Sequence, residues 1–206
     1  MKIAEVYNKF CQPPMLVQHQ LRVASVGMII FNALNISEDD AIKALLVHDL
    51  GNIVRLKFGL FDKDAYGKLG AEFYKSKKEE FIKKYGNIDH EVTVKMLREI
   101  NTSERIIQMV ESVNWENIES ATKSNDMILK VLNYSDMRVG PFGILAATER
   151  IDEVNKRKEN WPEYQLIRNK VILLEKQIFE NASISSTDII DNNIANIIEK
   201  LKQWNL

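Results

Sequence analysis

The stretch that decides the fold reads Ala41-Ile42-Lys43-Ala44-Leu45-Leu46-Val47-His48-Asp49-Leu50-Gly51. Its apolar residues have helical spacing, which predicts a helix with a buried face. Ser37-Glu38-Asp39-Asp40 has the pattern of a capping box that opens this helix, and Gly51 closes or bends it. His48 and Asp49 stand where the pattern predicts core. Burying an imidazole beside a carboxylate is costly unless something pairs with them, and a divalent metal ion would bind both.

Helical patterns extend along nearly the whole chain. It has only 8 glycines and 4 prolines, and no segment alternates with the period of two expected of a strand. Residues 51–70 are expected to form a loop with short helical pieces. The patterns predict one all-α domain over residues 1–206, with its last helices as an appendage. Further helices are expected before Pro13-Pro14 and over residues 15–34, 72–85, 89–100, 144–158 and 162–180. Asn87 or Asp89 is the expected cap of the helix over 89–100. Another helix is expected from Thr102 or Ser103 to Val113, one from Ser124-Asn125-Asp126 to Asp136, and the last after a cap at Ser185 or Ser186.

Composition limits the function classes. The net charge of -1 argues against a surface that binds nucleic acid or membrane by bulk electrostatics. The single cysteine, Cys11, excludes an intramolecular disulfide, and residues 1–5 carry an acid and lack the apolar run of a signal peptide. The longest apolar stretch, Val23 to Leu34, is too short to span a bilayer. We expect a cytoplasmic protein with no nucleic-acid or membrane partner.

Two more polar residues on apolar helices complete a candidate metal site. Adjacent residues on a helix point about 100° apart, so His48 and Asp49 reach one ion only at a helix end, which Gly51 supplies. His19 lies on the helix expected over 15–34, and Asp136 ends another apolar helix. Two imidazoles and two carboxylates leave water positions open on an octahedral ion. This donor set suits one divalent ion, Mn, Fe, Co, Ni or Mg, better than a structural zinc site with thiolates.

The order His19, then His48-Asp49, then Asp136, all on helices, resembles the HD-domain superfamily of metal-dependent phosphohydrolases. The segment 45–52 is similar to the family's second motif, in which the His-Asp pair follows apolar residues and precedes a glycine. This resemblance implies an all-α, HD-domain-like helical bundle, a divalent metal and hydrolysis of a phosphate ester.

The resemblance continues at the last aspartate. The segment 133–144, with Glu149-Arg150 after it, is similar to the last motif and its tail in a prokaryotic branch of mostly uncharacterised members. The HD-like core therefore covers about residues 14–155, and helices within 162–204 form the C-terminal appendage. Branches that bind two or three metals use extra histidines between the pair and the last aspartate. This chain offers only His90 there, so we expect one metal ion.

Several side chains receive roles beyond metal binding. Asp49 is expected to orient the attacking water that the metal activates. His90 opens a helix and is expected to take part in catalysis, either as a donor behind the ligands or as a ligand to a second ion. Arg22 and Arg138 are expected to bind the substrate phosphate, because arginine favours bidentate contact. Trp115 and the other tryptophans are interpreted as packing residues.

Two function classes follow from these residues. The first is an enzyme that hydrolyses a phosphate ester of a small molecule, with a nucleotide among the candidates. The alternative is a catalytically inactive metal- and ligand-binding or regulatory module of the same fold. The expected partner is a small phosphorylated substrate, and a homodimer is left open.

Overall fold

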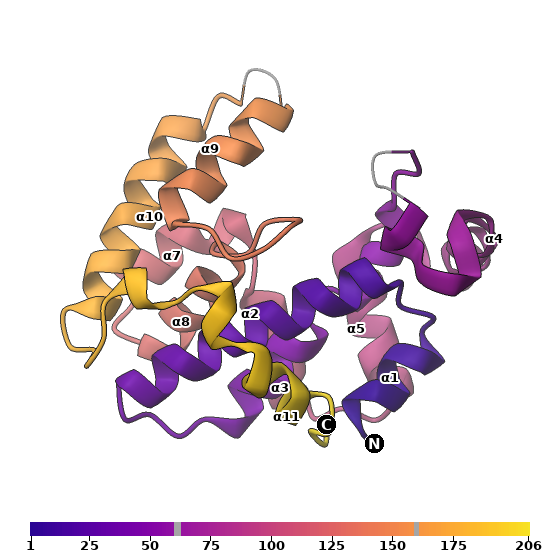
Figure 1. Ribbon diagram of the computed structural model, residues 1–206, viewed down its shortest axis with the longest axis horizontal. Coiled ribbons are helices and arrows are strands. Elements are labelled where there is room, and N and C mark those ends of the chain that lie inside the picture. The colour runs from indigo at the N-terminus through magenta and orange to yellow at the C-terminus, as the bar shows by residue number, and fades with distance from the viewer. Residues whose placement is uncertain (60–62, 159–160) are drawn as a thin grey trace.

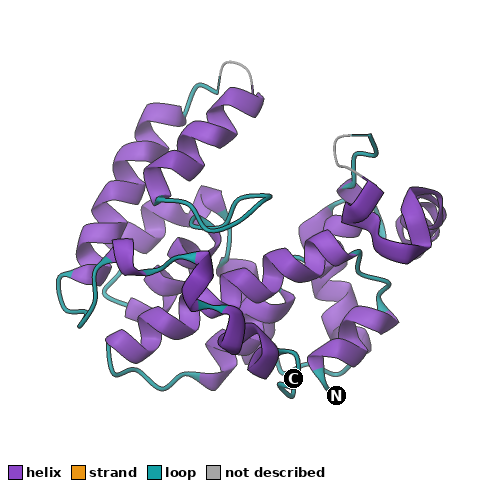
Figure 2. Cartoon of the chain, viewed as in Figure 1, coloured by secondary structure: helices purple, strands orange, loops and turns teal. Residues whose placement is uncertain are grey.

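The computed structural model describes residues 1–59, 63–158 and 161–206. Within these residues the chain consists of helices and connecting loops (Figure 2). Its only β-type pairings there are two isolated bridges, Lys2 with Asn205 and Val139 with Ile144. The prediction of an all-α fold is confirmed. None of the described helices is long and apolar enough to cross a membrane.

Figure 1 shows the helices in space, with the short 3-10 helices named η here. In chain order they are α1 (Ile3–Lys9), α2 (Pro14–Ala33), α3 (Asp39–Val47), η1 (Leu50–Arg55), η2 (Lys63–Leu69), α4 (Gly70–Tyr85), α5 (Asp89–Glu99), α6 (Glu104–Ser112), η3 (Trp115–Asn117), α7 (Ile118–Lys123), α8 (Met127–Asp136), α9 (Ala147–Lys158), α10 (Tyr164–Phe179), η4 (Ser186–Asp188), η5 (Asp191–Asn193) and α11 (Ala195–Leu201).

Local signals explain several helix ends. Pro14 occupies the first turn of α2, where its missing N–H costs nothing. The side chain of Ser103 accepts a hydrogen bond from the amide of Ile106 and so caps α6. Asp126 caps α8 in the same way by accepting from the amide of Ile128 over 2.9 Å. Gly86 ends α4 at a positive φ of 108°, which favours glycine.

Two predicted caps are wrong. Helix α3 begins at Asp39 after Glu38 with no side-chain cap among the described residues, so the capping box at Ser37 does not form. Glu38 instead accepts a hydrogen bond from Arg105 over 2.8 Å. Glu38, which stands at the N-cap position, thus pairs with a distant residue and does not cap the helix.

Helix α5 likewise begins without the side-chain cap that the sequence predicts. Ile88 precedes this helix, and neither Asn87 nor Asp89 caps it. The Asp89 carboxylate accepts instead from Nη1 of Arg55 over 2.8 Å. This pair joins the first turn of α5 to the end of η1.

The C-terminal part also differs from prediction. Ser185 caps only the 3-10 turn η4, and α11 begins at Ala195. Helix α9 begins at Ala147 rather than at Ile144, because Ile144 pairs with Val139 across a tight turn. Helices α9 and α10 lie side by side in Figure 1, and α10 packs on α7 and α8. The division into an HD-like core and an appendage stays a prediction.

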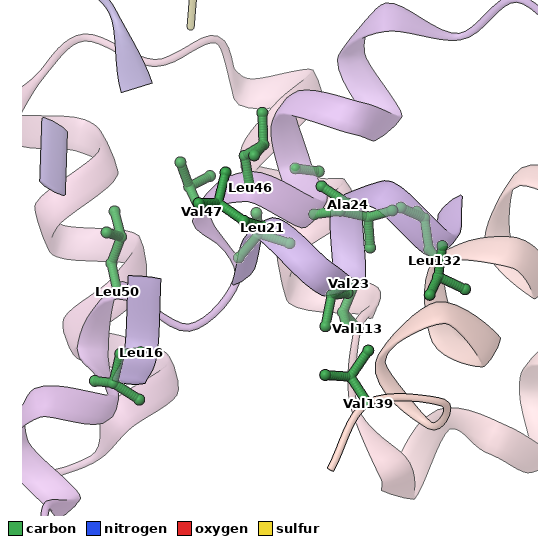
Figure 3. Packing of buried hydrophobic residues seen from close by; sticks show 14 of the residues in the cluster. Leu16, Leu21, Val23, Ala24, Leu46, Val47, Leu50, Val113, Leu132 and Val139 are labelled. Atoms are coloured by element: carbon green, nitrogen blue, oxygen red, sulfur yellow. The ribbon is translucent and has the colours of Figure 1, made fainter. Parts of the chain in front are cut away.

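Helix α2 runs through the middle of the core. It contacts α3, α8 and α11, so several of its faces are covered. Burial of each Leu or Val side chain contributes about 1.5–3 kcal/mol, and this packing holds α2, α3 and α8 in fixed positions. Figure 3 shows side chains from these helices and their neighbours gathered in this cluster: Leu16, Leu21, Val23, Ala24, Leu46, Val47, Leu50, Val113, Leu132 and Val139.

Candidate metal centre

The end of α3 turns His48 and Asp49 toward one place. His48 keeps helical dihedral angles, with φ -61° and ψ -28°. Asp49 leaves the helix, with φ -112° and ψ 19°, and η1 begins at the next residue. This change of backbone direction brings Oδ2 of Asp49 within 3.7 Å of Nε2 of His48. The adjacent pair therefore converges at a helix end, as the sequence predicted.

Gly51 makes this helix end possible. Its amide donates a hydrogen bond to Oγ1 of Thr93 on α5 over 2.9 Å. A Cβ at Gly51 would lie 1.9 Å from the carbonyl oxygen of Asp89 and 2.7 Å from the amide nitrogen of Thr93. Only a glycine lets the α5 backbone approach the segment after Asp49 this closely.

His19 of α2 and Asp136 of α8 complete the cluster. Nε2 of His19 lies 3.4 Å from Oδ2 of Asp49 and 3.2 Å from Oδ1 of Asp136. Oδ1 of Asp136 also lies 3.6 Å from Nε2 of His48. Two ligands at about 2.1 Å from one ion and about 90° apart would be roughly 3 Å from each other. The donor atoms of His19, His48 and Asp49 lie within 4.8 Å of one another, which suits ligands of a single ion, and Oδ1 of Asp136 adjoins both imidazoles.

His48 provides a direct test of whether a metal fits. Its Nδ1 lies 2.8 Å from the carbonyl oxygen of Leu45, which accepts the ring proton and leaves the lone pair on Nε2. This Nε2 is buried and has no hydrogen-bond partner among the described residues. Buried polar atoms are nearly always satisfied, and a backbone acceptor behind the ring is the usual arrangement of a metal-bound imidazole. The residues present therefore fit a divalent ion.

Trp115 orients the second carboxylate. Its indole Nε1–H donates to Oδ2 of Asp136 over 3.0 Å, which leaves Oδ1 directed at the two imidazoles. Trp115 is therefore more than the packing residue that the sequence indicates. A tryptophan that follows an apolar helix closely carries no local signal of which distant carboxylate its N–H will bind.

The cluster is partly open to solvent. The His48 side chain is 3% exposed, whereas those of His19, Asp136 and Asp49 are 17%, 16% and 24% exposed. Structural metal sites are closed, while catalytic sites keep a position for water or substrate. The exposure of three of the four side chains is typical of the second kind.

The carboxylates control protonation of the imidazoles in the metal-free cluster. Burial by itself lowers the pKa of His19, but contact with Asp136 and Asp49 outweighs it and raises the pKa to about 9. Burial likewise opposes the charged form of His48, and the charges of Asp49 and Asp136 raise its pKa. Burial raises the pKa of Asp136, but His19 and His48 hold it well below its usual range. Without metal, a protonated His19 therefore lies between the two carboxylates, and a cation that binds here must displace this proton.

Fold and cluster together define an all-helical protein with a His/Asp centre that can hold a divalent metal ion. The HD domain family matches residues 16–138, and the chain belongs to this family, whose members are generally metal-dependent hydrolases. The matched range lies within the residues 14–155 that the sequence motifs indicated. Neither a curated protein nor a solved structure matches the chain.

The structure brings the four predicted ligands together, and their metal binding stays a prediction. His90 lies outside the group of His19, His48 and Asp49, whose donor atoms are within 4.8 Å of one another. It lines a separate cleft of about 270 Å³ between α5 and α6, together with Lys95 and others. A catalytic role for His90 also stays a prediction.

The two predicted phosphate-binding arginines are occupied by the C-terminal segment. Nε of Arg22 donates to Oδ1 of Asp191 over 3.1 Å. Arg138 is 3% exposed, and its guanidinium donates to the carbonyls of Leu145, Ser186 and Ile189 as well as to a tyrosine hydroxyl. Arg138 thereby holds residues 186–189 against the core. Phosphate binding by Arg22 and Arg138 stays a prediction.

Proposed function

We propose that this protein is a cytoplasmic, metal-dependent phosphohydrolase that acts on a phosphate ester of a small molecule, with nucleotides among the candidate substrates. One observation supports this most directly. The buried, unpaired Nε2 of His48 belongs to a cluster of two imidazoles and two carboxylates that solvent can reach. Family membership supports the same reaction class.

The proposed roles follow from the donor atoms. His19, His48, Asp49 and Asp136 would hold one divalent ion, Mn, Fe, Co, Ni or Mg. Such an ion would acidify a bound water and would polarise a phosphoryl oxygen of the substrate. Asp49 is the most exposed of the four, at 24%, and one of its oxygens faces the imidazoles. Its second oxygen would accept a hydrogen bond from the attacking water and orient it.

Asp136 would act mainly as an anchor. One of its oxygens faces both imidazoles, and the other is held by Trp115. This fixed carboxylate keeps the ligand set in place during the reaction. A carboxylate with both oxygens engaged is a poor proton acceptor, so Asp49 is the better candidate for contact with water.

Metal analysis followed by a phosphatase screen tests the proposal. Purified protein would be stripped with chelator, reloaded with Mn, Fe, Co, Ni or Mg, and assayed against phosphomonoesters and nucleotides. We expect metal to raise the melting temperature by mass action on the native state and to restore hydrolysis of at least one ester. His48→Gln should lose both effects. Metal binding without turnover on any substrate would favour the alternative, a metal- and ligand-binding module.

A further inference from the structure

We propose that Arg150 is the residue that binds the phosphate group of the substrate. This inference rests on the proposed function and adds a substrate contact to it. Arg150 lies on α9, beyond the part of the chain that the family matches. In the sequence, Arg150 stands in the tail of the last motif, where no local pattern indicates a role for it.

Arg150 is connected to the metal centre through a single aromatic ring. Its guanidinium carbon lies over the indole of Trp115, 5.5 Å from the ring centroid. The N–H of the same indole donates to the metal-facing carboxylate of Asp136. Arg150 and Asp136 therefore contact the same indole ring. Burial lowers the pKa of Arg150, and the negative charge of Asp136 opposes this by raising it.

The guanidinium has a donor that the protein does not use. The Arg150 side chain is 11% exposed, and Nη1 pairs with Glu153. Nε is buried and has no hydrogen-bond partner among the described residues. An unsatisfied N–H on a buried cation is costly. An anionic ligand that reaches the exposed part of this side chain would add a charge-assisted hydrogen bond to the guanidinium.

A comparison with Arg22 and Arg138, the two arginines expected from the sequence to bind phosphate, supports the proposed role of Arg150. Arg22 is paired with Asp191, and Arg138 donates to four acceptors of the protein. Arg150 keeps an unpaired Nε although it lies close to a cluster of carboxylates. A phosphate that contacts the metal on one side and Arg150 on the other would have its charge neutralised from both sides.

The chain contains a matched control. Arg157 lies two turns further along α9 and pairs with the same Glu153, and its side chain is 55% exposed. Replacing Arg157 removes one positive charge and one Glu153 contact but leaves Trp115 and the metal centre untouched. An effect seen for Arg150 and not for Arg157 would therefore reflect the buried position beside Trp115 rather than the shared contact with Glu153.

The test measures binding of inorganic orthophosphate to Mn-loaded protein by calorimetry, together with the Mn affinity and the melting temperature. For Arg150→Gln we expect orthophosphate affinity to fall about 10- to 100-fold, as for loss of a hydrogen bond to a charged group. Mn affinity should be unchanged. Arg157→Gln should bind orthophosphate like the wild type. Arg150→Lys keeps the charge but not the planar fork, and should lose part of the affinity; it provides the comparison if Arg150→Gln does not fold.

Equal orthophosphate binding by the wild type and the folded Arg150 variants would overturn the assignment. An equal loss of orthophosphate affinity in Arg157→Gln would also overturn it. So would the absence of orthophosphate binding to the wild type at millimolar concentration. The phosphohydrolase proposal is judged separately by turnover. If Arg150→Gln loses phosphate affinity but the wild type hydrolyses no ester, the anion site stands and the proposed reaction falls.

Discussion

Trp115 holds the carboxylate of Asp136 in one orientation: the indole N–H donates to Oδ2 over 3.0 Å, while Oδ1 faces Nε2 of His19 at 3.2 Å. The two residues are 21 positions apart in the chain. The hydrogen bond restricts rotation of the carboxylate and so keeps Oδ1 directed at the imidazoles. Partners behind the ligands commonly decide how well a site binds its metal.

Trp115→Phe should therefore weaken metal binding. Phenylalanine keeps an aromatic ring but removes the N–H, so Asp136 can rotate away from the cluster. We expect the Kd for Mn to rise about 10- to 100-fold, measured by calorimetry on chelator-stripped protein. Trp161→Phe is the control, because Trp161 packs against Trp115 with ring centroids 5.8 Å apart. Unchanged affinity in Trp115→Phe would show that the hydrogen bond does not position the ligand.

Stability of the metal-free protein should fall as the solution becomes alkaline. Contact with Asp136 and Asp49 raises the pKa of His19 to about 9 against the opposing effect of burial. The folded protein thus binds this proton more tightly than the unfolded chain. Its contribution to stability is full below about pH 6.5 and is lost as pH rises through about 9. Urea unfolding with chelator across this range measures the slope.

Two variants test whether this pH dependence of the free energy of unfolding comes from the cluster. His19→Gln should flatten it, whereas His90→Ala leaves the cluster intact and should retain it. Metal binding should show the complementary behaviour, because the ion displaces protons and its apparent affinity grows with pH. Calorimetry in buffers of different ionisation enthalpy would detect the released protons. A metal affinity independent of pH would contradict a protonated His19 in the free site.

Replacement of Asp49 should abolish metal-dependent hydrolysis. Asp49→Ala removes both a ligand oxygen and the acceptor proposed to orient the attacking water. Asp49→Asn keeps an amide oxygen and should retain weak metal binding without full activity. His90→Ala should reduce turnover less, because His90 lies outside the cluster. All variants need equal metal loading in the assay, and wild-type turnover by Asp49→Ala would disprove the proposed mechanism.

Gly51→Ala should destabilise the fold and disturb the centre together. The added methyl group would meet backbone atoms of α5 at 1.9 Å and 2.7 Å, and backbone cannot move aside without shifting a helix. We expect a loss of about 1–3 kcal/mol or more in the free energy of unfolding, measured in urea. Gly27→Ala is the comparison, because its closest obstacle is the flexible Leu45 side chain at 2.3 Å. An equal or larger loss for Gly27→Ala would show that the α5 contact is not the stricter constraint.

Patterns that operate within a few turns of helix were sufficient for much of the fold. The spacing of apolar residues predicted the long helices. Of the two caps expected for α6 the structure has Ser103, and α8 opens within the expected segment 124–126, with Asp126 as its cap. Short elements such as α7 were not predicted, because six residues contain too little periodicity to be recognised. His48-Asp49 was recognisable because two polar residues in an apolar helix have few structural explanations.

By itself, the sequence determined the helix pattern and the four polar residues that interrupt it, because periodicity and capping are local properties. Tertiary structure decided which side chains meet. Arg22 binds Asp191, 169 residues away, and Arg138 holds residues 186–189. The same packing leaves Arg150 beside Trp115 with an unpaired donor. Pairing between distant residues depends on how helices pack, and many donors and acceptors compete for each partner, so spacing along the chain does not encode it.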